Sequence, residues 1–359
     1  MKTNFNTNTS NIDLEKKDFF SSCVIIPALN PSTSLLTLIE SLFQKGIKHI
    51  IIVDDGSTVD FQTTFRSAAD LGAIIIHHAT NMGKGEALKT AFRYAINFKF
   101  EAVVTVDADG QHSAADAARV LRRVLSEKLP VCVLGVRNFN GEVPLRSKFG
   151  NVLTRNVVRA FSSLRVSDTQ TGLRGFSAQL LPGLCEVTGH RYEFEMQMLL
   201  HIAKAKLKLI EIPIETIYID NNSDSHFNPV LDSLRIYWVL LRDIFISLSS
   251  FGIDIAVFTL FNALIDDILL STYAARLISS SFNFAGNRVF VFKTIGNYKM
   301  GRELFQYIIL AIILATVSGG LVQGLYETTN WNVTLCKIFV DFTLYSASFL
   351  IRKYYIFKD

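Results

Sequence analysis

Four apolar stretches in the last third of the chain constrain its fold more than any other feature. They lie at about 244–264, 269–290, 305–326 and 333–355, and each approaches the roughly 20 residues that a helix needs to cross a bilayer. Residues 234–250 begin basic and aromatic and then become apolar, as in a helix that enters a membrane interface. A second soluble helical domain is the alternative, but small residues within 307–326 favour helices packed in a membrane. The pattern predicts an all-α transmembrane domain of four helices.

Polar residues interrupt these stretches at Asp254, Arg276, Asn283 and Asp341. A charged side chain is costly in hydrocarbon, so we expect Asp254, Arg276 and Asp341 to face the interior of the bundle. There they either pair and hold the helices together or line a route through the bundle.

Basic residues indicate the orientation of the four helices. They gather in the connection between the second and third stretches and after the fourth, at Arg288, Lys293, Lys299, Arg302, Arg352, Lys353 and Lys358. The short connections near 266–267 and 328–332 carry neither Lys nor Arg. By the positive-inside rule, we expect a multi-pass protein of the cell membrane whose termini and middle connection are cytoplasmic.

The part of the chain before these stretches has the pattern of an α/β domain. Strands are predicted at 23–26, 49–53, 73–77, 102–106 and 131–135, with helices between them at 34–45, 84–98 and 114–127. This alternation predicts a mostly parallel sheet with helices on both faces and a ligand site at the carboxyl ends of its strands.

The domain division follows from these patterns. Residues 1–20 are polar and lack the apolar run of a secretory signal, so we expect a flexible tail there. The α/β domain is expected at 21–232, and the interfacial helix with the transmembrane domain at 233–359. The large α/β domain would therefore be cytoplasmic as well.

Charge and cysteine content exclude some classes of function. The net charge of +4 gives no electrostatic reason to expect nucleic acid as a partner. Cys23, Cys132, Cys185 and Cys336 lie far apart and form no C-x-x-C pair, so neither a zinc site nor a disulfide framework is indicated. A reducing compartment is the natural interpretation.

Two carboxylates follow the predicted strand at 102–106. Asp107 and Asp109 flank Ala108, which places two hard oxygen ligands at the end of a strand, where they suit Mg²⁺ or Mn²⁺ bridging a diphosphate. Such a pair can also serve a turn or a helix cap, so the D-x-D pattern alone does not define a site.

Two earlier strands also end in polar, turn-forming segments. Residues 54–57 (Asp-Asp-Gly-Ser) close the strand at 49–53, and residues 27–30 (Pro-Ala-Leu-Asn) close the first strand. Ordinary strand-to-helix turns would explain each segment separately but not all of them together. Residues 81–85 (Asn-Met-Gly-Lys-Gly) open a helix, and Lys84 there can meet a phosphate although the Walker A frame is absent.

Taken in this order, residues 27–30, 53–57, 81–85 and 107–112 resemble the GT-A fold glycosyltransferases of family 2. The branch is that of the dolichyl-phosphate mannose and dolichyl-phosphate glucose synthases. The resemblance continues through Arg137, Arg146-Ser147, Gly150-Asn151 and residues 168–175, and it covers about 21–232. The membrane half is similar to GtrA-type four-helix proteins, on looser patterns at 283–292 and 348–357.

The resemblance implies roles for the matching residues. Asp55, with Pro27 and Ala28, would hold the nucleoside of a sugar nucleotide, and Arg137 and Arg146 would bind the phosphate of a polyprenyl acceptor, a task that suits a guanidinium. The metal and its diphosphate would lie among Asp107, Asp109 and Gln111. The expected donor site is completed by Asn30, Asp54, Lys84 and Ala108, and the acceptor site by Asn151. The first motif departs from the family pattern. It has Leu29 where the family often has Tyr, and Asn30-Pro31 where Asn-Glu is usual, which leaves the contacts of Asn30 open.

The implied activity is inverting transfer of mannose or glucose from a GDP- or UDP-sugar to polyprenyl phosphate, such as dolichyl or undecaprenyl phosphate. The product would supply cell-surface glycan assembly. The bound metal would neutralise the leaving diphosphate. Because a lipid phosphate is ionised at pH 7, no residue is expected to be an obligatory general base, and Asp107, Asp109, Arg137 and Arg146 are the expected catalytic residues.

Two other functions remain as alternatives, and some residues have no settled role. A processive polysaccharide synthase would carry Q-x-x-R-W, whereas residues 170–175 have one residue too many and no Trp. A lipid-linked sugar flippase with a non-catalytic cytoplasmic domain is disfavoured by the intact D-x-D. The spacing of Glu193 and Glu195 suggests a helix start with one carboxylate inward, but solvated or capping roles are the expectation for them. His112 is a supporting or acceptor-loop residue, or merely polar. Membrane lipid and a second copy of the chain are further expected partners.

Overall fold

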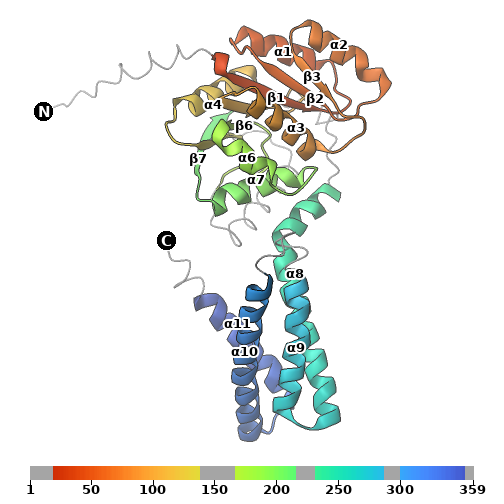
Figure 1. Cartoon of the computed structure of the whole chain (residues 1–359), viewed down its shortest axis with the longest axis vertical. Helices are drawn as coiled ribbons and strands as arrows, with labels where there is room; N and C mark the ends of the chain where they lie inside the picture. Colours follow the sequence, from red (N-terminus) through yellow and green to blue (C-terminus); the bar gives the residue numbers. More distant parts are fainter. Residues whose placement is uncertain (1–18, 138–165, 216–230, 287–299, 352–359) are drawn as a thin grey trace, which may run out of the picture. The chain divides into compact units, whose positions relative to one another are not determined.

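The computed structural model describes residues 19–137, 166–215, 231–286 and 300–351 (Figure 1). These residues belong to two compact units, Met1–Leu240 and Leu241–Asp359, and each is described separately. The expected tail at 1–20 lies outside the described residues except for its last two, which belong to a short 3-10 helix, η1 (Phe19–Ser21).

The first unit is built on a seven-stranded sheet with the order β3-β2-β1-β4-β6-β5-β7. The strands are β1 (Ser22–Ala28), β2 (Ile50–Asp54), β3 (Ile74–His77), β4 (Ala102–Thr105), β5 (Val131–Arg137), β6 (Arg174–Ser177) and β7 (Lys208–Ile214). Only β6 runs antiparallel to its neighbours, β4 and β5. The predicted mostly parallel sheet and its first five strands are confirmed, whereas β6 and β7 were not predicted.

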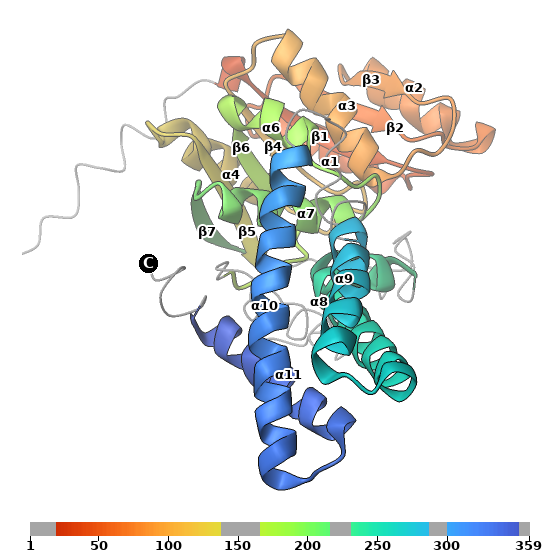
Figure 2. The ribbon, with the colours of Figure 1, turned by 60° about the horizontal axis from the view of Figure 1, so that its bottom comes forward.

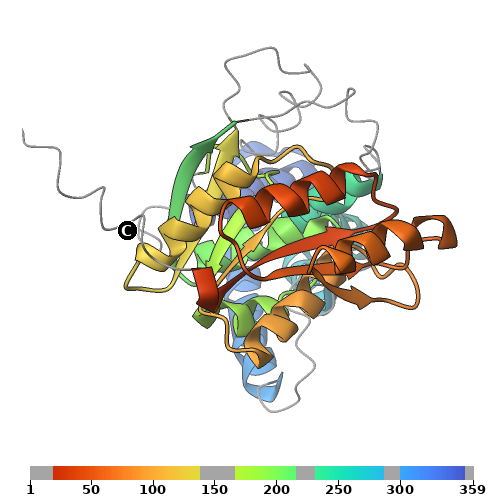
Figure 3. The ribbon, with the colours of Figure 1, turned by 90° about the horizontal axis from the view of Figure 1, so that it is seen from above.

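Helices cover both faces of this sheet. Helices α1 (Ser34–Gln44), α2 (Gln62–Asp70) and α4 (Ala114–Ser126) pack together on one face, and α3 (Lys84–Asn97), α6 (Leu181–Cys185) and α7 (Glu193–Lys204) pack on the other. Figure 3 shows α1 and α4 on one side of the strands and α3 on the other. Short 3-10 helices, η2 (Val59–Phe61) and η3 (Ala178–Leu180), precede α2 and α6. The predicted helices at 34–45, 84–98 and 114–127 are confirmed.

The apolar composition of the strands explains why they lie at the centre. Every residue of β2, Ile50 to Asp54, is buried, as expected for a strand covered by helices on both faces. Its isoleucines and valine are β-branched and suit a pleated sheet. Helix α4 begins where Ser113 Oγ accepts a hydrogen bond from the Asp116 amide at 3.1 Å, a typical N-cap.

The second unit holds helices at the four predicted stretches, and the first of these helices, α8, begins before the unit does. They are α8 (Leu231–Ile265), α9 (Ile268–Gly286), α10 (Met300–Thr329) and α11 (Val333–Ile351), and α10 packs against both α9 and α11 (Figure 2). Among the described residues, one helical segment, Ile244–Ile265 with a mean hydropathy of 2.0, is long and apolar enough to cross a membrane. The expectation of four membrane spans stays a prediction.

The charged residues of the second unit meet inside it, as predicted. Arg276 Nη2 lies 3.1 Å from Asp341 Oδ1 and 3.7 Å from Asp254 Oδ2. Lys337, which was not predicted to join these charges, is fully buried, and its Nζ lies 2.9 Å from Asp341 Oδ2 and 3.3 Å from Asp254 Oδ2. Two cations therefore balance two carboxylates, and the expected pairing is confirmed.

Candidate active site

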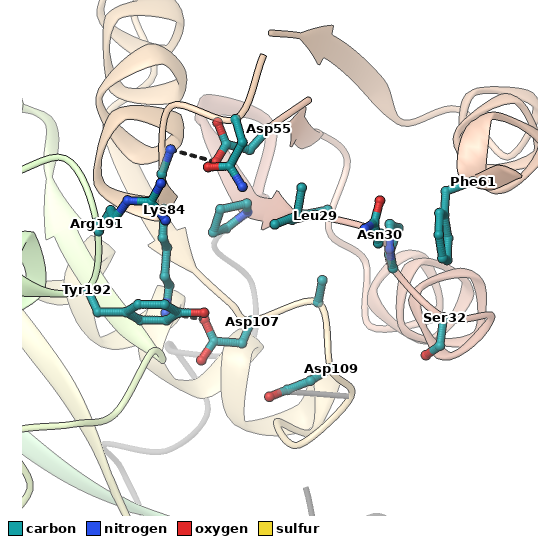
Figure 4. Close-up of a pocket in the computed structure, with 16 residues that line it drawn as sticks. Leu29, Asn30, Ser32, Asp55, Phe61, Lys84, Asp107, Asp109, Arg191 and Tyr192 are labelled. Carbon is teal, nitrogen blue, oxygen red and sulfur yellow. Dashed lines mark hydrogen bonds and ion pairs between the residues drawn. The ribbon is translucent and has the colours of Figure 1, made fainter. Parts of the chain in front are cut away.

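A cavity of about 390 Å³ opens at the carboxyl ends of β1, β2 and β4. These strands are neighbours and parallel, with Ala28 beside Asp54 and Ile25 beside Thr105, so the segments that follow them meet at one edge of the sheet. The cavity is lined by the predicted residues Pro27, Ala28, Asn30, Asp55, Lys84, Asp107, Ala108 and Asp109 (Figure 4). The structure therefore brings together most of the expected donor and metal residues.

Asp55 ties the end of β2 to the segment before α3. Its carboxylate accepts hydrogen bonds from the Met82 amide at 2.9 Å, the Gly83 amide at 2.7 Å and His78 Nδ1 at 2.8 Å. Gly83 has a φ of +97°, which other residues rarely adopt. The wall of the cavity is thus fixed by hydrogen bonds to a buried carboxylate.

Asp54 does not line the cavity, although it was predicted to bind the donor. Its carboxylate accepts hydrogen bonds from the Ser57 amide at 2.8 Å, His77 Nδ1 at 2.9 Å and Gln62 Nε2 at 3.2 Å. Burial by itself would raise the pKa of Asp54, but these hydrogen bonds outweigh it and hold the pKa below the usual 3.8. Asp54 stabilises the segment that follows β2.

Asn30 lines the cavity, but its side chain serves a neighbouring loop. Its Oδ1 accepts a hydrogen bond from the Thr58 backbone amide at 3.0 Å, and the backbone amide of Asn30 donates to Ser57 Oγ at 2.8 Å. Its φ of +46° is a left-handed conformation that Asn tolerates better than most residues. The unusual first motif therefore joins the ends of β1 and β2.

Lys84 lies between two carboxylates at the edge of the cavity. Its Nζ is 2.7 Å from Asp107 Oδ1 and 3.1 Å from Glu195 Oε2. Burial alone would lower the pKa of Lys84, but the charges of Asp107 and Glu195 raise it instead. Burial would raise the pKa of Asp107, and the ammonium of Lys84 outweighs burial and holds that pKa far below its usual range.

Asp109 has a different electrostatic environment from Asp107. Burial and the neighbouring charge of Asp107 both raise the pKa of Asp109. The Gln111 amide donates a hydrogen bond to Asp109 Oδ1 at 3.0 Å. His112 is buried, its Nε2 lies 3.8 Å from Asp107 Oδ2, and its Nδ1 has no hydrogen-bond partner within the described part of the chain.

Asp107 and Asp109 fit a divalent cation bound together with a phosphate. Within the described ranges, no group of three or more His, Cys, Asp or Glu residues forms a cage for a metal. Magnesium commonly uses one or two carboxylates and takes its remaining ligands from water and substrate phosphates. Two carboxylates at an open cavity match that mode, because a diphosphate can supply further oxygen ligands.

The structure describes one of the predicted acceptor-binding residues. Arg137 donates to the fully buried Asp168 through Nε at 2.6 Å and Nη2 at 3.0 Å. This two-point contact fixes the plane of the guanidinium at the end of β5. The other predicted acceptor residues, Arg146 and Asn151, lie outside the described residues.

Several cavity residues were not found from the sequence. Arg191 and Tyr192 come from the segment before α7, and Ser32 and Phe61 lie between β1 and α1 and in η2. Gly83 and Gly85 let that segment approach, because a Cβ on either would collide with His190. No local pattern in the sequence indicated this contact, because the segment before α7 lies far from the two glycines along the chain.

The two glutamates in the first turn of α7 have different partners. Glu195 is buried and points to Lys84, so the expected solvated or capping role is wrong for this residue and it is the one inward carboxylate. Glu193 accepts hydrogen bonds from the amides of His190 at 3.0 Å and Arg191 at 3.3 Å. Glu193 therefore has the expected capping role.

The fold is an α/β domain with acidic and basic side chains gathered in one cavity at the carboxyl ends of its strands. The chain belongs to glycosyl transferase family 2: residues 23–181 match the model of that family. Residues 244–357 match the GtrA/DPMS transmembrane domain. The protein is thus a glycosyltransferase with a GT-A catalytic fold and a C-terminal helical domain of the GtrA type, as the sequence predicted.

Similar proteins extend over most of the first unit. The chain is 31% identical over 240 residues to a UDP-N-acetylglucosamine–dolichyl-phosphate N-acetylglucosaminyltransferase of Methanococcus voltae, covering 61% of this chain and 94% of the relative. It is 28% identical over 200 residues to an undecaprenyl-phosphate mannosyltransferase of Micrococcus luteus, covering 53% of this chain and 81% of that relative. A solved structure of glucosyl-3-phosphoglycerate synthase from Mycobacterium tuberculosis aligns with a TM-score of 0.46 and 20% identity, over 68% of this chain and 85% of that one.

Proposed function

We propose that this protein transfers a hexose, mannose or glucose, from a GDP- or UDP-sugar to polyprenyl phosphate with inversion at the anomeric carbon. The observation that carries the proposal is the joining of Asp55, Lys84, Asp107 and Asp109 in one cavity at the strand ends. The relatives named as transferases to dolichyl and undecaprenyl phosphate support the acceptor class. The proposed product is a polyprenyl-phosphate sugar for cell-surface glycan assembly.

The proposed donor site uses each lining residue for a separate task. Asp55, Pro27 and Ala28 form the wall for the nucleoside, with Asn30 and Ala108 beside them. We propose that Asp107 and Asp109, with Gln111 beside them, hold Mg²⁺ or Mn²⁺, which would neutralise the leaving nucleoside diphosphate when bound. Lys84 supplies a further cation at the same edge of the cavity.

The proposed acceptor site holds an anion and needs no base. A phosphate of the lipid is ionised near neutral pH, so it can attack the anomeric carbon directly. Arg137, oriented by Asp168, would bind that phosphate and offset its repulsion by the donor diphosphate. Arg146 and Asn151 are proposed as its partners on the resemblance alone. A single displacement gives inversion.

The proposed topology places this chemistry at the cytoplasmic face of the membrane. The GtrA/DPMS domain and the apolar segment Ile244–Ile265 support membrane association. We propose that residues 21–232 are the catalytic domain and that 233–359 form the interfacial helix and four spans, with both termini cytoplasmic. The distribution of Lys and Arg between the connections supports this orientation.

Donor and acceptor can be tested with membranes that contain the full chain. We expect one of labelled GDP-mannose, UDP-glucose or UDP-N-acetylglucosamine, supplied with polyprenyl phosphate, to give a short lipid product that mild acid cleaves. Chelation with EDTA should stop transfer and added Mn²⁺ should restore it. Asp109→Ala should lower transfer by about 100-fold or more, because the charge of the leaving group is then poorly neutralised.

A control variant and four other results complete the transfer test. Asp60→Asn alters an exposed aspartate near the same edge of the sheet and should leave transfer unchanged. Near-normal transfer by Asp109→Ala would overturn the metal site. A long polymer would identify a processive synthase, and the absence of product from every donor would favour the flippase. A UDP-N-acetylglucosamine product would retain the lipid-phosphate acceptor and replace the proposed hexose.

A further inference from the structure

Lys84 makes an unusual double contact for a residue at the edge of a ligand cavity. It lies at the first position of α3, and its ammonium bridges Asp107, which follows β4, and Glu195, in the first turn of α7. The ammonium also lies 5.6 Å from the centre of the Tyr192 ring. Its side chain is only 16% exposed, so few positions are open to the ammonium. Three elements of the chain thus determine where it lies.

Glu195 is itself held by a second cation, deeper in the protein. Arg174 Nη2 lies 4.0 Å from Glu195 Oε1, and Arg174 Nη1 donates to the backbone oxygen of Glu195 at 2.6 Å. Arg174 is fully buried and also donates to the backbone oxygen of Thr171 at 2.8 Å. Glu195 is therefore a fixed anchor, whereas Lys84 ends a flexible four-carbon side chain.

The ammonium and a divalent cation compete for the same carboxylate. Lys84 contacts Asp107 Oδ1, and Asp107 is one of the two carboxylates proposed to hold the metal. A metal ion on Asp107 would repel the neighbouring ammonium, since like charges at a few ångströms repel strongly in a partly buried site. Glu195 is the other carboxylate within reach of the ammonium in the described structure.

We propose that Glu195 is a positioning residue that retains Lys84 when Asp107 takes up the divalent cation. Lys84 then remains at the cavity, where it faces the diphosphate of the donor, and no longer competes for Asp107. This inference rests on the proposed metal site at Asp107 and Asp109. It assigns Glu195 no contact with metal or substrate, because its effect passes through Lys84.

The proposal predicts opposite effects for the two residues on metal binding. Without the carboxylate of Glu195, Lys84 has Asp107 as its remaining acidic partner and competes more strongly with the cation. Without the ammonium, Asp107 becomes more available to the cation. A direct attraction between Glu195 and the cation would also make Glu195→Gln weaken binding, but it would do so whether or not Lys84 is present.

A double-mutant cycle separates these explanations. Mn²⁺ binding to the full-length protein in detergent, without nucleotide, is measured by electron paramagnetic resonance of the free ion. Glu195→Gln should weaken binding by about tenfold, which is the usual size of an outer-shell effect. Lys84→Met should strengthen it by about fivefold to tenfold. In the Lys84→Met protein, Glu195→Gln should change the affinity by less than about twofold.

Controls keep each outcome decisive. Glu193→Gln, on the same turn of α7 but bonded to backbone amides, should leave the Mn²⁺ affinity unchanged. If Glu195→Gln fails to fold in a thermal melt, Lys84→Met still decides, because weaker rather than tighter binding would contradict the proposal. An equal effect of Glu195→Gln with and without Lys84 would also overturn it. Asp109→Ala tests the metal site separately. If this variant binds Mn²⁺ normally, the proposed metal site is wrong. If it loses Mn²⁺ while the effects of Glu195→Gln and Lys84→Met are independent of each other, only the role of Glu195 is wrong.

Discussion

Adjacent aspartates at the end of β2 have different roles because their side chains leave the strand on opposite sides. Asp55 faces the cavity and binds the amides of Met82 and Gly83. Asp54 faces away from it and binds Ser57, Gln62 and His77. The alternation of side chains along a strand produces this division. Asp55 therefore belongs to the wall of the cavity, and Asp54 supports the loop beside it.

The lowered pKa of Asp54 predicts a pH-dependent contribution to stability. A carboxylate whose folded pKa lies below its unfolded value stabilises the protein fully above the unfolded pKa, and the contribution is lost as the pH falls through the folded pKa. Asp54→Asn should therefore lower the free energy of unfolding by about 1–2 kcal/mol near pH 7. The difference from the unchanged protein should shrink below the usual aspartate pKa of 3.8.

Thermal melts of the full chain between about pH 3 and pH 7 measure this difference. Asp60→Asn, at an exposed position in η2, serves as the matched control and should shift the melting temperature little at any pH. A stability gap for Asp54→Asn that stays constant down to the lowest pH would show that the carboxylate is not stabilised by its charge.

At the scale of elements, the antiparallel strand β6 places the segment before it against the D-x-D residues. Thr105, the last residue of β4, pairs with Arg174 and donates from Oγ1 to the Gly172 backbone oxygen at 2.8 Å. This pairing presses Gly172 against Asp107, so that a Cβ at position 172 would collide with the Asp107 carboxylate. The segment before β6 thus helps to set the orientation of a proposed metal ligand.

Gly172→Ala should therefore impair function more than stability. The added methyl group displaces the carboxylate of Asp107, which can rotate, so the melting temperature should change by the equivalent of about 1 kcal/mol or less. Mn²⁺ affinity and sugar transfer should both fall by about 10-fold to 100-fold.

The Mn²⁺ affinity of Gly172→Ala is measured by electron paramagnetic resonance of the free ion, and its sugar transfer with a labelled donor. Gly183→Ala is the control, since the nearest atom to its new Cβ is the end of the His201 side chain at 3.4 Å. Unchanged Mn²⁺ affinity in Gly172→Ala would contradict the proposed role of the β4–β6 contact.

At the scale of the whole molecule, the second unit holds a cluster of charged side chains between its helices. Asp254 comes from α8, Arg276 from α9, and Lys337 and Asp341 from α11. Ser318 of α10 donates to Asp341 at 2.6 Å, so all four helices contribute. We expect the cluster to favour this packing of the helices, because an arrangement that separates these side chains would leave a buried charge without a partner.

Removing one member of this cluster should destabilise the helical unit. Lys337→Met leaves two carboxylates against one cation, and the expected loss is about 3–5 kcal/mol of unfolding free energy. The double variant Lys337→Met with Asp341→Asn restores the balance between Asp254 and Arg276, so part of the loss should be recovered.

Thermal stability of the full chain in detergent tests this pair of variants. Leu335→Met, at an exposed position of α11, should have little effect and controls for substitution in that helix. Equal stability of Lys337→Met and the unchanged protein would mean that the cluster does not hold the helices together.

Much of the fold could be predicted because its signals are local. The runs of β-branched residues indicated β1 to β5, and the apolar stretches indicated α8 to α11. β6 is four residues long and contains glycine and arginine, so its pattern is too short and too polar to indicate a strand. β7 was missed because its residues are mostly exposed or only partly buried and alternate weakly.

The sequence by itself determined the first five strands with three of the helices between them, the four helical stretches and the set of strand ends at which the cavity lies, because each depends on residues close together in the chain. The tertiary structure decided which aspartate faces the cavity, that Lys337 completes a neutral cluster, and that Lys84 meets Glu195. Those two residues are 111 positions apart, and their contact depends on how α3 and α7 pack on the same face of the sheet. No local pattern encodes such a contact, because it arises only after the sheet has brought distant segments together.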